Sequence, residues 1–426
     1  MSLRTNSRRR FLGIVSASCV SLTALSGMVK GNEKEAPLVD SLPSLQCPTE
    51  TGITICWSVN APSLGSVEFG TKPNKLDQAA CGEVTGMKAY HDRYFQIRME
   101  GLEPQRRYYY RTATTPLTYL AGHIQQRGET VYSEVFSFET PCPNRKTASF
   151  SVINDTHERK ETLGLIKKKL AELDADYTIW NGDILGSYND VDVSVRAALK
   201  PGGGQSFSTE RPLLFVPGNH EYYGAWVRNL PRLFAPWEHS ANEDRKFSRN
   251  FVVRNGPLAL IGLDTGDNRS DDNPEKGGSV SFDPYRAAQY DWLERALTSP
   301  AVATAPFVVA FCHIPLFDPV SDAHGGDLPI SYGRFQRQAG KLWGSLFDRY
   351  GVQLVVCGHT HFFRYDAPTS DRKWAQLVGG GPDLSRHPIT VIHGVTRDGH
   401  LEVIVHELGS GRELDHFSFS PRFQQS

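Results

Sequence analysis

Hydrophobic and polar residues alternate in the first part of the chain, between residues 41 and 140. In one such run Ile53, Ile55, Trp57 and Val59 are separated by single residues. The same spacing recurs in three further groups, namely Phe95/Ile97/Met99, Tyr108/Tyr110 and Phe136/Phe138. Successive side chains of a β-strand point to opposite faces, so this spacing predicts strands with one buried face. Short alternating runs separated by turn-rich stretches predict an antiparallel β-sandwich.

The hydrophobic pattern changes after residue 147. Continuous apolar runs, which predict buried strands, occupy residues 149–153, 177–180, 213–216, 258–263, 307–311 and 354–356. Leu163, Ile166, Leu170 and Leu173 have helical spacing between the first two runs, and Tyr290, Leu293 and Leu297 have it before the fifth. Strands that alternate with helices predict a layered α/β domain whose functional loops follow the carboxyl ends of the strands.

These two patterns divide the chain into a predicted all-β sandwich at residues 41–141 and a predicted α/β domain at residues 147–415. Pro141-Cys142-Pro143 is a plausible linker between them. The chain has 426 residues, of which 39% are hydrophobic. This content is sufficient for two cores of ordinary size.

The N-terminal 26 residues predict an export signal. Ser7-Arg8-Arg9-Arg10-Phe11-Leu12 precedes an apolar run from Gly13 to Leu25, and Ala24-Leu25-Ser26 offers small residues for cleavage. The segment resembles a twin-arginine signal, which implies the twin-arginine export machinery as a partner and a periplasmic or secreted protein. A basic cytosolic tail or an uncleaved anchor are the alternatives. The run is short for a bilayer and contains serines, so no stable membrane anchor is expected.

Charge excludes one class of partner. The formal net charge is −1, and removal of the four arginines in residues 1–26 would leave about −5. A mildly acidic chain lacks the basic surface that grips nucleic acid, so no nucleic-acid binding is expected. Six cysteines would remain after cleavage (Cys47, Cys56, Cys81, Cys142, Cys312 and Cys357). An exported protein can form disulfides, but the sequence does not define their pairing.

Potential metal ligands follow five of the predicted strands. The motifs are Asp155-Thr156-His157, Asn181-Gly182-Asp183, Gly218-Asn219-His220-Glu221, Cys312-His313 and Gly358-His359-Thr360-His361. Taken alone, each motif is as typical of a solvated loop or a buried histidine as it is of a metal site. Five in series, each directly after an apolar strand, are not explained in that way. Carboxylate, imidazole and amide ligands together suit Zn, Fe or Mn rather than Mg or Ca alone.

This ordered set resembles the signature of the calcineurin-like metallophosphoesterases. The family's fold is a four-layer α/β/β/α sandwich. The resemblance implies one metal at Asp155, His157 and His361, and a second at Asn219, His313 and His359. Asp183 would bridge the two, and a hydroxide between the ions would attack the phosphoryl group. His220 would be the proton donor to the leaving group or a hydrogen-bond donor to the transition state, and Glu221 would orient its loop.

The predicted sandwich resembles the fibronectin type III-like N-terminal domain of purple acid phosphatases. Gly101-Leu102-Glu103-Pro104 followed by Tyr108-Tyr109-Tyr110-Arg111 is typical of such domains. The metal motifs differ, however. Purple acid phosphatases carry a metal-ligating tyrosine three residues after the bridging aspartate, where this chain has Gly186, and they have glycine in place of His157. Tyr188 is two residues out of register. The sequence therefore predicts a colourless centre.

Candidate substrate-binding residues follow the last motifs. Arg364 and Arg386 are potential bidentate donors to a phosphate, and His324 lies in a long loop that could shape the pocket. Each can equally be an ordinary loop residue. Gly202-Gly203-Gly204 has no preceding strand in phosphate-loop register and is interpreted as a loop, while Asp264 is interpreted as structural.

The leading functional hypothesis is an exported phosphatase with two metal ions that acts on a small phosphorylated substrate. One alternative is a phosphodiesterase or nucleotidase acting on nucleotides or phospholipid-type diesters. A second alternative, from another class, is a surface binding protein with an inactive phosphoesterase domain. Inactive domains usually lack a ligand, whereas all seven are present here.

Overall fold

The largest sheet has nine strands, six of which belong to the α/β domain and three to the N-terminal sandwich. The computed structural model describes residues 36–204, 206–237, 245–317, 332–383 and 388–423. In spatial order the nine strands are β22 (Glu413–Phe419), β21 (His400–Glu407), β20 (Thr390–Arg397), β11 (Ser149–Ile153), β12 (Tyr177–Asn181), β13 (Leu213–Val216), β1 (Ser44–Thr49), β2 (Gly52–Ser58) and β6 (Tyr94–Glu100). The strands β11, β12 and β13 are parallel, so their carboxyl ends lie at one edge.

A six-stranded sheet faces the first one. Its strands, in spatial order, are β14 (Phe251–Asn255), β15 (Leu258–Gly262), β16 (Phe307–Phe311), β17 (Leu354–Cys357), β19 (Ala375–Val378) and β18 (Arg364–Asp366). Side chains from both sheets form one buried cluster, which includes Phe150 and Ile179 from the first sheet and Val309 and Val356 from the second. Continuous apolar strands are expected in this arrangement because both faces of each sheet are covered.

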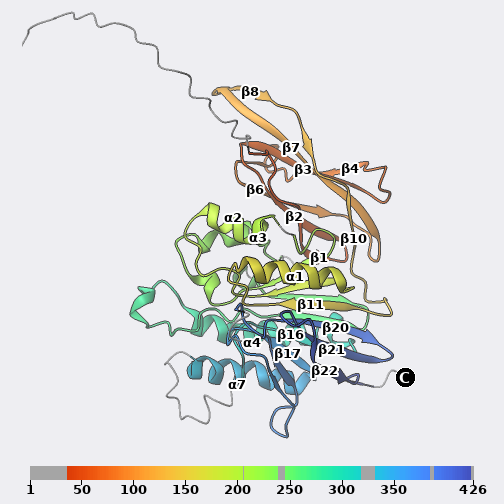
Figure 1. Cartoon of the computed structure of the whole chain (residues 1–426), viewed down its shortest axis with the longest axis vertical. Coiled ribbons are helices and arrows are strands. Elements are labelled where there is room, and N and C mark those ends of the chain that lie inside the picture. The colour runs from red at the N-terminus through yellow and green to blue at the C-terminus, as the bar shows by residue number, and fades with distance from the viewer. Residues whose placement is uncertain (1–35, 205, 238–244, 318–331, 384–387, 424–426) are drawn as a thin grey trace, which may run out of the picture. The chain divides into compact units, whose positions relative to one another are not determined.

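Helices cover the outer face of each sheet. The helices are α1 (Lys160–Glu172), α2 (Val191–Leu199), α3 (Pro201–Gly204), α4 (Phe282–Thr298), α5 (Pro300–Ala303) and α7 (Tyr332–Tyr350). Figure 1 shows α1, α2 and α3 on one side of the strands and α4 and α7 on the other. Leu163 and Ile166 of α1 pack on the nine-stranded sheet, while Leu293 of α4 and Trp343 of α7 pack on the six-stranded sheet. The predicted four-layer α/β/β/α sandwich is confirmed.

The elements predicted from continuous apolar runs agree closely with the structure. The run at 149–153 is β11, the run at 213–216 is β13 and the run at 307–311 is β16. The helix predicted from Leu163 to Leu173 ends at Glu172, with Leu173 as its C-terminal cap. The three glycines at 202–204 fall in a short turn assigned as α3, in which Gly202 and Gly203 have non-helical, positive φ angles.

The N-terminal part forms the predicted β-sandwich. Its second sheet has the order β10 (Phe136–Glu139), β7 (Arg107–Ala121), β3 (Ser63–Gly70) and β4 (Gln78–Ala80); β5 (Tyr90–His91) pairs with β3, and β8 (Ile124–Arg127) and β9 (Val131–Tyr132) pair with β7. Ile55, Trp57 and Tyr110 belong to the core between the sheets. Tyr108 lies in β7, just after the turn singled out in the sequence, and its hydroxyl accepts a hydrogen bond from the amide of Glu103 in that turn (3.0 Å).

The sandwich and the α/β domain share a sheet. Strands β1, β2 and β6 of the sandwich extend the nine-stranded sheet, because β1 pairs in parallel with β13 through Gln46 and Leu213. The buried Gln46 side chain also accepts from the Ala235 amide (2.7 Å) and donates to the Leu233 carbonyl (3.0 Å). The sandwich thereby holds the segment that follows β13. The domain boundaries drawn from the sequence remain predictions.

Within the described ranges Cys56, Cys81, Cys142, Cys312 and Cys357 are free thiols, and Sγ of Cys47 donates to the Ala235 carbonyl (3.0 Å). Cys312 and Cys357 are buried side by side, with sulfur atoms 3.7 Å apart. Within the described residues, no helix combines the length and apolar character needed to span a bilayer. The proposed signal at residues 1–26 lies outside the described residues.

Candidate metal centre

The five sequence motifs meet where the two sheets face each other. Three of them follow β11, β12 and β13, which are neighbours in the nine-stranded sheet. The other two follow β16 and β17, which are neighbours in the six-stranded sheet and run parallel. Because the carboxyl ends of parallel strands lie at one edge of a sheet, loops far apart in sequence converge on one place.

Most of the potential ligands have unusual backbone conformations. Positive φ angles occur at Asp155 (48°), His157 (43°), Asp183 (53°), His359 (71°) and His361 (63°). Such left-handed conformations are uncommon outside glycine and cost on the order of 1–3 kcal/mol each. Hydrogen bonds between adjacent loops hold them, since the Asp155 amide donates to the Gly182 carbonyl (3.0 Å) and the His157 amide donates to the Asp183 carbonyl (3.1 Å). The loops aim their side chains inward at the expense of backbone strain.

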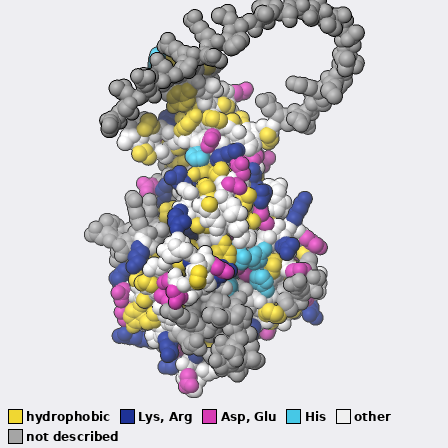
Figure 2. Space-filling model, turned by 90° about the vertical axis from the view of Figure 1, so that its left-hand side faces the viewer, with side chains coloured by type: hydrophobic (Ala, Val, Ile, Leu, Met, Phe, Trp, Pro, Cys, Tyr) yellow, Lys and Arg dark blue, Asp and Glu magenta, His cyan; other side chains and the backbone are white. Residues whose placement is uncertain are grey.

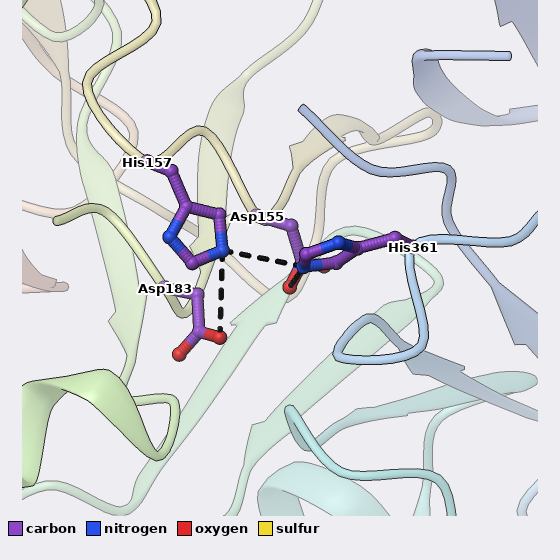
Figure 3. A group of neighbouring side chains, drawn as sticks. All are labelled: Asp155, His157, Asp183 and His361. Atoms are coloured by element: carbon purple, nitrogen blue, oxygen red, sulfur yellow. Dashed lines mark hydrogen bonds and ion pairs between the residues drawn. The ribbon is translucent and has the colours of Figure 1, made fainter. Parts of the chain in front are cut away.

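Four side chains form a first group able to hold a metal ion, namely Asp155, His157, Asp183 and His361. In Figure 3 these side chains point toward one another. Nε2 of His157 lies 3.2 Å from Nε2 of His361 and 3.8 Å from Oδ2 of Asp183. Oδ1 of Asp155 lies 3.4 Å from Nε2 of His361. Each residue offers one atom, and these atoms all lie within 4.8 Å of one another.

A second group shares Asp183 with the first and adds His313 and His359. All three side chains are buried, and Nε2 of His313 lies 3.2 Å from Oδ2 of Asp183. Asn219 is buried beside them, at the start of the turn that contains His220. The two groups correspond to the two ligand sets that the sequence predicts, with Asp183 common to both. That these residues bind metal remains a proposal.

The donor set fits a pair of cations. Three buried polar atoms, Oδ1 of Asp155, Oδ1 of Asn219 and Nε2 of His313, have no hydrogen-bond partner among the described residues. Buried polar atoms are normally paired, so unpaired atoms gathered at one place require an explanation. Nitrogen and oxygen atoms of these types are ligands for Zn, Fe or Mn. A bound cation would give these atoms a partner, and its charge would offset that of the clustered carboxylates.

Neighbouring groups fix the direction of the ligand atoms. Nδ1 of His313 donates to the Asn181 carbonyl (2.8 Å), which turns Nε2 toward Asp183. Oδ2 of Asp155 accepts from Nδ2 of Asn154 (2.6 Å) and from the His359 amide (2.8 Å). The other oxygen, Oδ1, is therefore the one that faces the site. Hydrogen bonds of this kind set the tautomer and orientation of metal ligands.

Glu221 ties two of the loops together, as the sequence predicted for it. Oε2 of this buried carboxylate accepts from the amides of Asp183 (2.9 Å) and Gly218 (2.7 Å). Oε1 accepts from the Ile184 amide (3.1 Å) and from the Tyr188 hydroxyl (2.7 Å). Four donors to one carboxylate fix the loops after β12 and β13 relative to each other. The Tyr188 hydroxyl is thus bonded to Glu221 rather than directed at the ligand cluster.

The electrostatics favour a positive charge in the cluster. Burial opposes protonation of His313, but the carboxylates of Asp183 and Asp155 outweigh it and raise the pKa of His313 to about 10. Burial and the charge of His313 lower the pKa of His359 to about 3, and burial lowers that of His157 to about 4. A proton on His313 therefore offsets part of the charge of the two carboxylates when no metal is bound. Metal binding would displace this proton.

His220 lies at the open side of the cluster. Its Nδ1 donates to the Gly186 carbonyl (2.7 Å), and its Nε2 lies 3.8 Å from Oδ2 of Asp183. The side chains of His220 and His361 are 28% and 38% exposed, whereas His313 is fully buried. Figure 2 shows histidine side chains gathered at one place on the molecular face it draws. A molecule can thus approach the cluster from the side of His220 and His361.

Of the three residues predicted for substrate binding, Arg364 is the one that the structure describes. Arg364 lies at the start of β18, where its Nε donates to Oδ2 of Asp366 (3.0 Å) and its guanidinium also donates to the Phe317 carbonyl (2.8 Å). Its role as a phosphate ligand remains a prediction, and the structure gives it structural partners. His324 and Arg386 lie outside the described residues. Asp264 is buried and accepts from the Tyr285 hydroxyl (3.1 Å), which agrees with a structural role.

Sequence reasoning missed three residues that support the site. Asn154, which holds Asp155, directly precedes the first motif and had no distinguishing pattern. Tyr223 accepts from Nδ2 of Asn219 (3.1 Å), and its ring lies 4.8 Å from that of His220. Gly381 had no assigned role, yet a Cβ there would clash with the Cβ of His361. A glycine at this position therefore allows the last motif to approach the neighbouring loop.

Comparisons with known protein families match both parts of the chain. Residues 148–363 match the model of the calcineurin-like phosphoesterases. Residues 43–140 match the model of the purple acid phosphatase N-terminal domain. The first match covers all seven potential metal ligands.

Curated relatives agree with these matches. The chain is 24% identical over 311 residues to purple acid phosphatase 22 of Arabidopsis thaliana, with 70% of this chain and 60% of the relative covered. It is also 24% identical over 330 residues to the probable purple acid phosphatase 20 of the same organism, covering 72% and 65%. The chain thus spans less than two thirds of the length of these relatives.

Solved structures with a similar fold include the purple acid phosphatase PPD1 from seeds of yellow lupin, Lupinus luteus. It superposes with a TM-score of 0.61 at 16% identity and covers 89% of this chain and 74% of its own. PhoD superposes with a TM-score of 0.58 at 12% identity, covering 90% and 94%. At these identities the likeness concerns the fold.

Proposed function

The chain belongs to the calcineurin-like phosphoesterase family, and we propose that it is an exported enzyme that hydrolyses phosphate monoesters with two bound metal ions. One observation carries the proposal: two groups of ligand-type side chains share Asp183, and the side chains of His220 and His361 at this place are partly exposed. Export rests on the twin-arginine pattern in residues 1–26.

The metals would be held by the side chains that the sequence assigns to them. Asp155, His157 and His361 would hold one ion, Asn219, His313 and His359 the other, and Asp183 both. Two metal ions supply charge neutralisation at a phosphoryl group and a hydroxide near neutral pH. The protein contributes the fixed direction of its ligand atoms, which the hydrogen bonds to Asp155 and His313 provide.

His220 is proposed to move a proton during the reaction. The hydrogen bond to the Gly186 carbonyl fixes Nδ1 as the donor and leaves Nε2 facing the ligand cluster. When Nε2 is protonated, it can donate to the oxygen of the leaving group as the ester bond breaks. The backbone amide of His220 donates to Oδ1 of Asp183 (3.0 Å), so the positions of the two residues are linked.

The alternatives differ in how well the geometry supports them. A binding protein with an inactive domain is not favoured, because all seven ligands are present and converge. A phosphodiesterase would use the same cluster, so an assay with both types of substrate is needed to distinguish it from a monoesterase.

Metal-free protein reconstituted with Mn, Zn or Fe should hydrolyse an aryl phosphate monoester faster than the matching diester. If neither is hydrolysed by protein shown to hold two metal ions, the proposal fails.

The metal centre is expected to be colourless. Gly186 occupies the position of the metal-ligating tyrosine of purple acid phosphatases, and the hydroxyl of the nearby Tyr188 donates to the buried Glu221. With no phenolate on the metal, protein loaded with ferric iron should show no tyrosinate charge-transfer band in its visible spectrum. A band that disappears in Tyr188→Phe would show that this tyrosine reaches the metal and that the assignment of ligands is wrong.

A further inference from the structure

Asn219 is the one amide among the seven proposed metal ligands, and only one of its two terminal atoms can bind a cation. The oxygen Oδ1 offers lone pairs to a metal ion, whereas the nitrogen Nδ2 carries two hydrogens that a cation repels. The two orientations of an amide have nearly the same shape, so packing does not choose between them. The hydrogen bonds of Asn219 must therefore decide which atom faces the ligand cluster.

Tyr223 is the hydrogen-bond partner of this amide. Asn219 precedes a short 3₁₀ turn at His220–Tyr222, and Tyr223 directly follows that turn. Nδ2 of Asn219 donates to the Tyr223 hydroxyl (3.1 Å). Oδ1 of Asn219 is buried and has no hydrogen-bond partner among the described residues. The bond to Tyr223 thus holds Nδ2 and leaves Oδ1 for a metal ion.

The direction of this hydrogen bond is set on the other side of Tyr223. A tyrosine hydroxyl has a single hydrogen to donate, although its oxygen can also accept. The Tyr223 hydroxyl donates to Oδ1 of Asp267 (2.9 Å), and Oδ1 of Asn268 (3.1 Å) is a second acceptor nearby. Because an ionised carboxylate can only accept, the hydroxyl hydrogen is committed to Asp267. Toward Asn219 the hydroxyl can then only accept, so the amide must present Nδ2.

Asp267 is itself held in one place. Its side chain is buried and pairs with Lys276, and its Oδ1 also accepts from the Arg269 amide (3.2 Å). The positive charge of Lys276 favours the ionised form of Asp267, which is the form that only accepts. The same two cationic residues lie over the Tyr223 ring, Arg269 at 5.0 Å and Lys276 at 4.3 Å from its centre. The ring and the carboxylate are therefore fixed relative to each other.

We propose that Tyr223 is a positioning residue of the metal centre, whose hydroxyl, oriented by Asp267, turns Oδ1 of Asn219 toward the second metal ion. Asn219 follows β13 of the nine-stranded sheet, whereas Asp267 follows β15 of the six-stranded sheet. The chain of hydrogen bonds thus joins loops from both sheets behind one ligand. This inference rests on the metal centre of the proposed function, and it extends that centre to two residues outside both ligand groups.

Tyr223→Phe tests the hydroxyl, because it keeps the ring that contacts His220. The affinity for the second metal ion should fall about 10–100-fold, the usual effect of losing a hydrogen bond to a metal ligand. The affinity for the first ion should be unchanged. Calorimetric titration of metal-free protein with Zn²⁺ gives both dissociation constants. Anomalous diffraction at sub-saturating Zn²⁺ shows which of the two positions has lost occupancy.

Tyr222→Phe is the matched control, since this neighbouring tyrosine donates its hydroxyl hydrogen to Asp264 instead. It should leave both dissociation constants unchanged. Without metal, Tyr223→Phe should have nearly the wild-type Tm. On addition of Zn²⁺ its Tm should rise less than that of the wild type, because a ligand that binds more weakly stabilises less.

A second variant tests the role of Asp267. In Asp267→Asn the introduced amide can donate to the Tyr223 hydroxyl, whose hydrogen is then free to turn toward Asn219. Asp267→Asn should therefore also weaken binding of the second ion. Because this effect passes through the hydroxyl, the same substitution should cause no further loss of metal affinity in a Tyr223→Phe background.

The outcomes distinguish this inference from the proposed function. Unchanged Zn²⁺ affinity in Tyr223→Phe, a loss at the position of the first ion, or additive losses in the double variant would each overturn the inference. A lower Tm of metal-free Tyr223→Phe with unchanged Zn²⁺ affinity would show a structural role alone, which also overturns it. Weakened binding at the second position, in a protein that hydrolyses no phosphate ester, would support the inference although the proposed function fails.

Discussion

Asp183→Asn is expected to lower turnover by at least about 10³-fold, because it removes the one side chain that both ligand groups share. The amide has nearly the same shape, but it carries no charge to balance two cations. Metal content should fall from two ions per chain toward one or none. Turnover of an aryl phosphate and elemental analysis of the same preparation measure the two effects together.

The control for Asp183→Asn is Asp77→Asn, a carboxylate in the sandwich whose described ion pair is with Lys75 at the surface. It should leave both turnover and metal content unchanged. The fold of Asp183→Asn should also be largely retained, since the hydrogen bonds of Glu221 to the loop amides do not require the Asp183 carboxylate. Wild-type turnover in Asp183→Asn would contradict the assignment of the site.

His220→Ala is expected to lower kcat by about 10²–10⁴-fold for an alkyl phosphate while both metals stay bound. The reason is its position: Nε2 faces the cluster, and the residue lies outside both ligand groups. The loss should be much smaller for p-nitrophenyl phosphate, whose leaving group departs without a proton. Measurement of kcat for a series of leaving groups of different pKa distinguishes proton donation from a structural role.

The alternative for His220 gives a different pattern. If the residue only bonded the phosphoryl group in the transition state, the loss in His220→Ala would be the same for good and poor leaving groups. If it bound a metal, the variant would lose metal ions. Each result would assign His220 a role other than proton donation.

The buried strands were predictable from the sequence because their residues have one environment throughout. Both faces of β11 and β16 are covered, so every position in them is apolar or small and the run is continuous. The meeting of the candidate ligands at one place was predictable for a related reason, since a loop that begins where such a run ends lies at the edge of the sheet. The backbone strain at Asp155 and Asp183 was not, because no local pattern distinguishes a left-handed aspartate from an ordinary one.

Long-range contacts account for most of what the sequence did not predict. The pairing of β1 with β13 joins strands that are separated in sequence by the rest of the sandwich and by β11 and β12, and neither strand carries a signal for its partner. A cavity of about 820 Å³ likewise combines the segment after β13 with residues before and at the start of α4. Arg364 shows a different limit. Residues two apart in a strand share a face, so the carboxylate of Asp366 lies beside Arg364. It binds the guanidinium that the sequence had assigned to a phosphate.

Anomalous diffraction from crystals of the metal-loaded protein tests the two-metal centre most directly. Data collected at the absorption edge of the bound metal should show two peaks about 3.5–4 Å apart, with Asp183 between them. One peak should lie against Asp155, His157 and His361, and the other against Asn219, His313 and His359. A single peak in protein that contains two ions per chain, or peaks away from these side chains, would contradict the account.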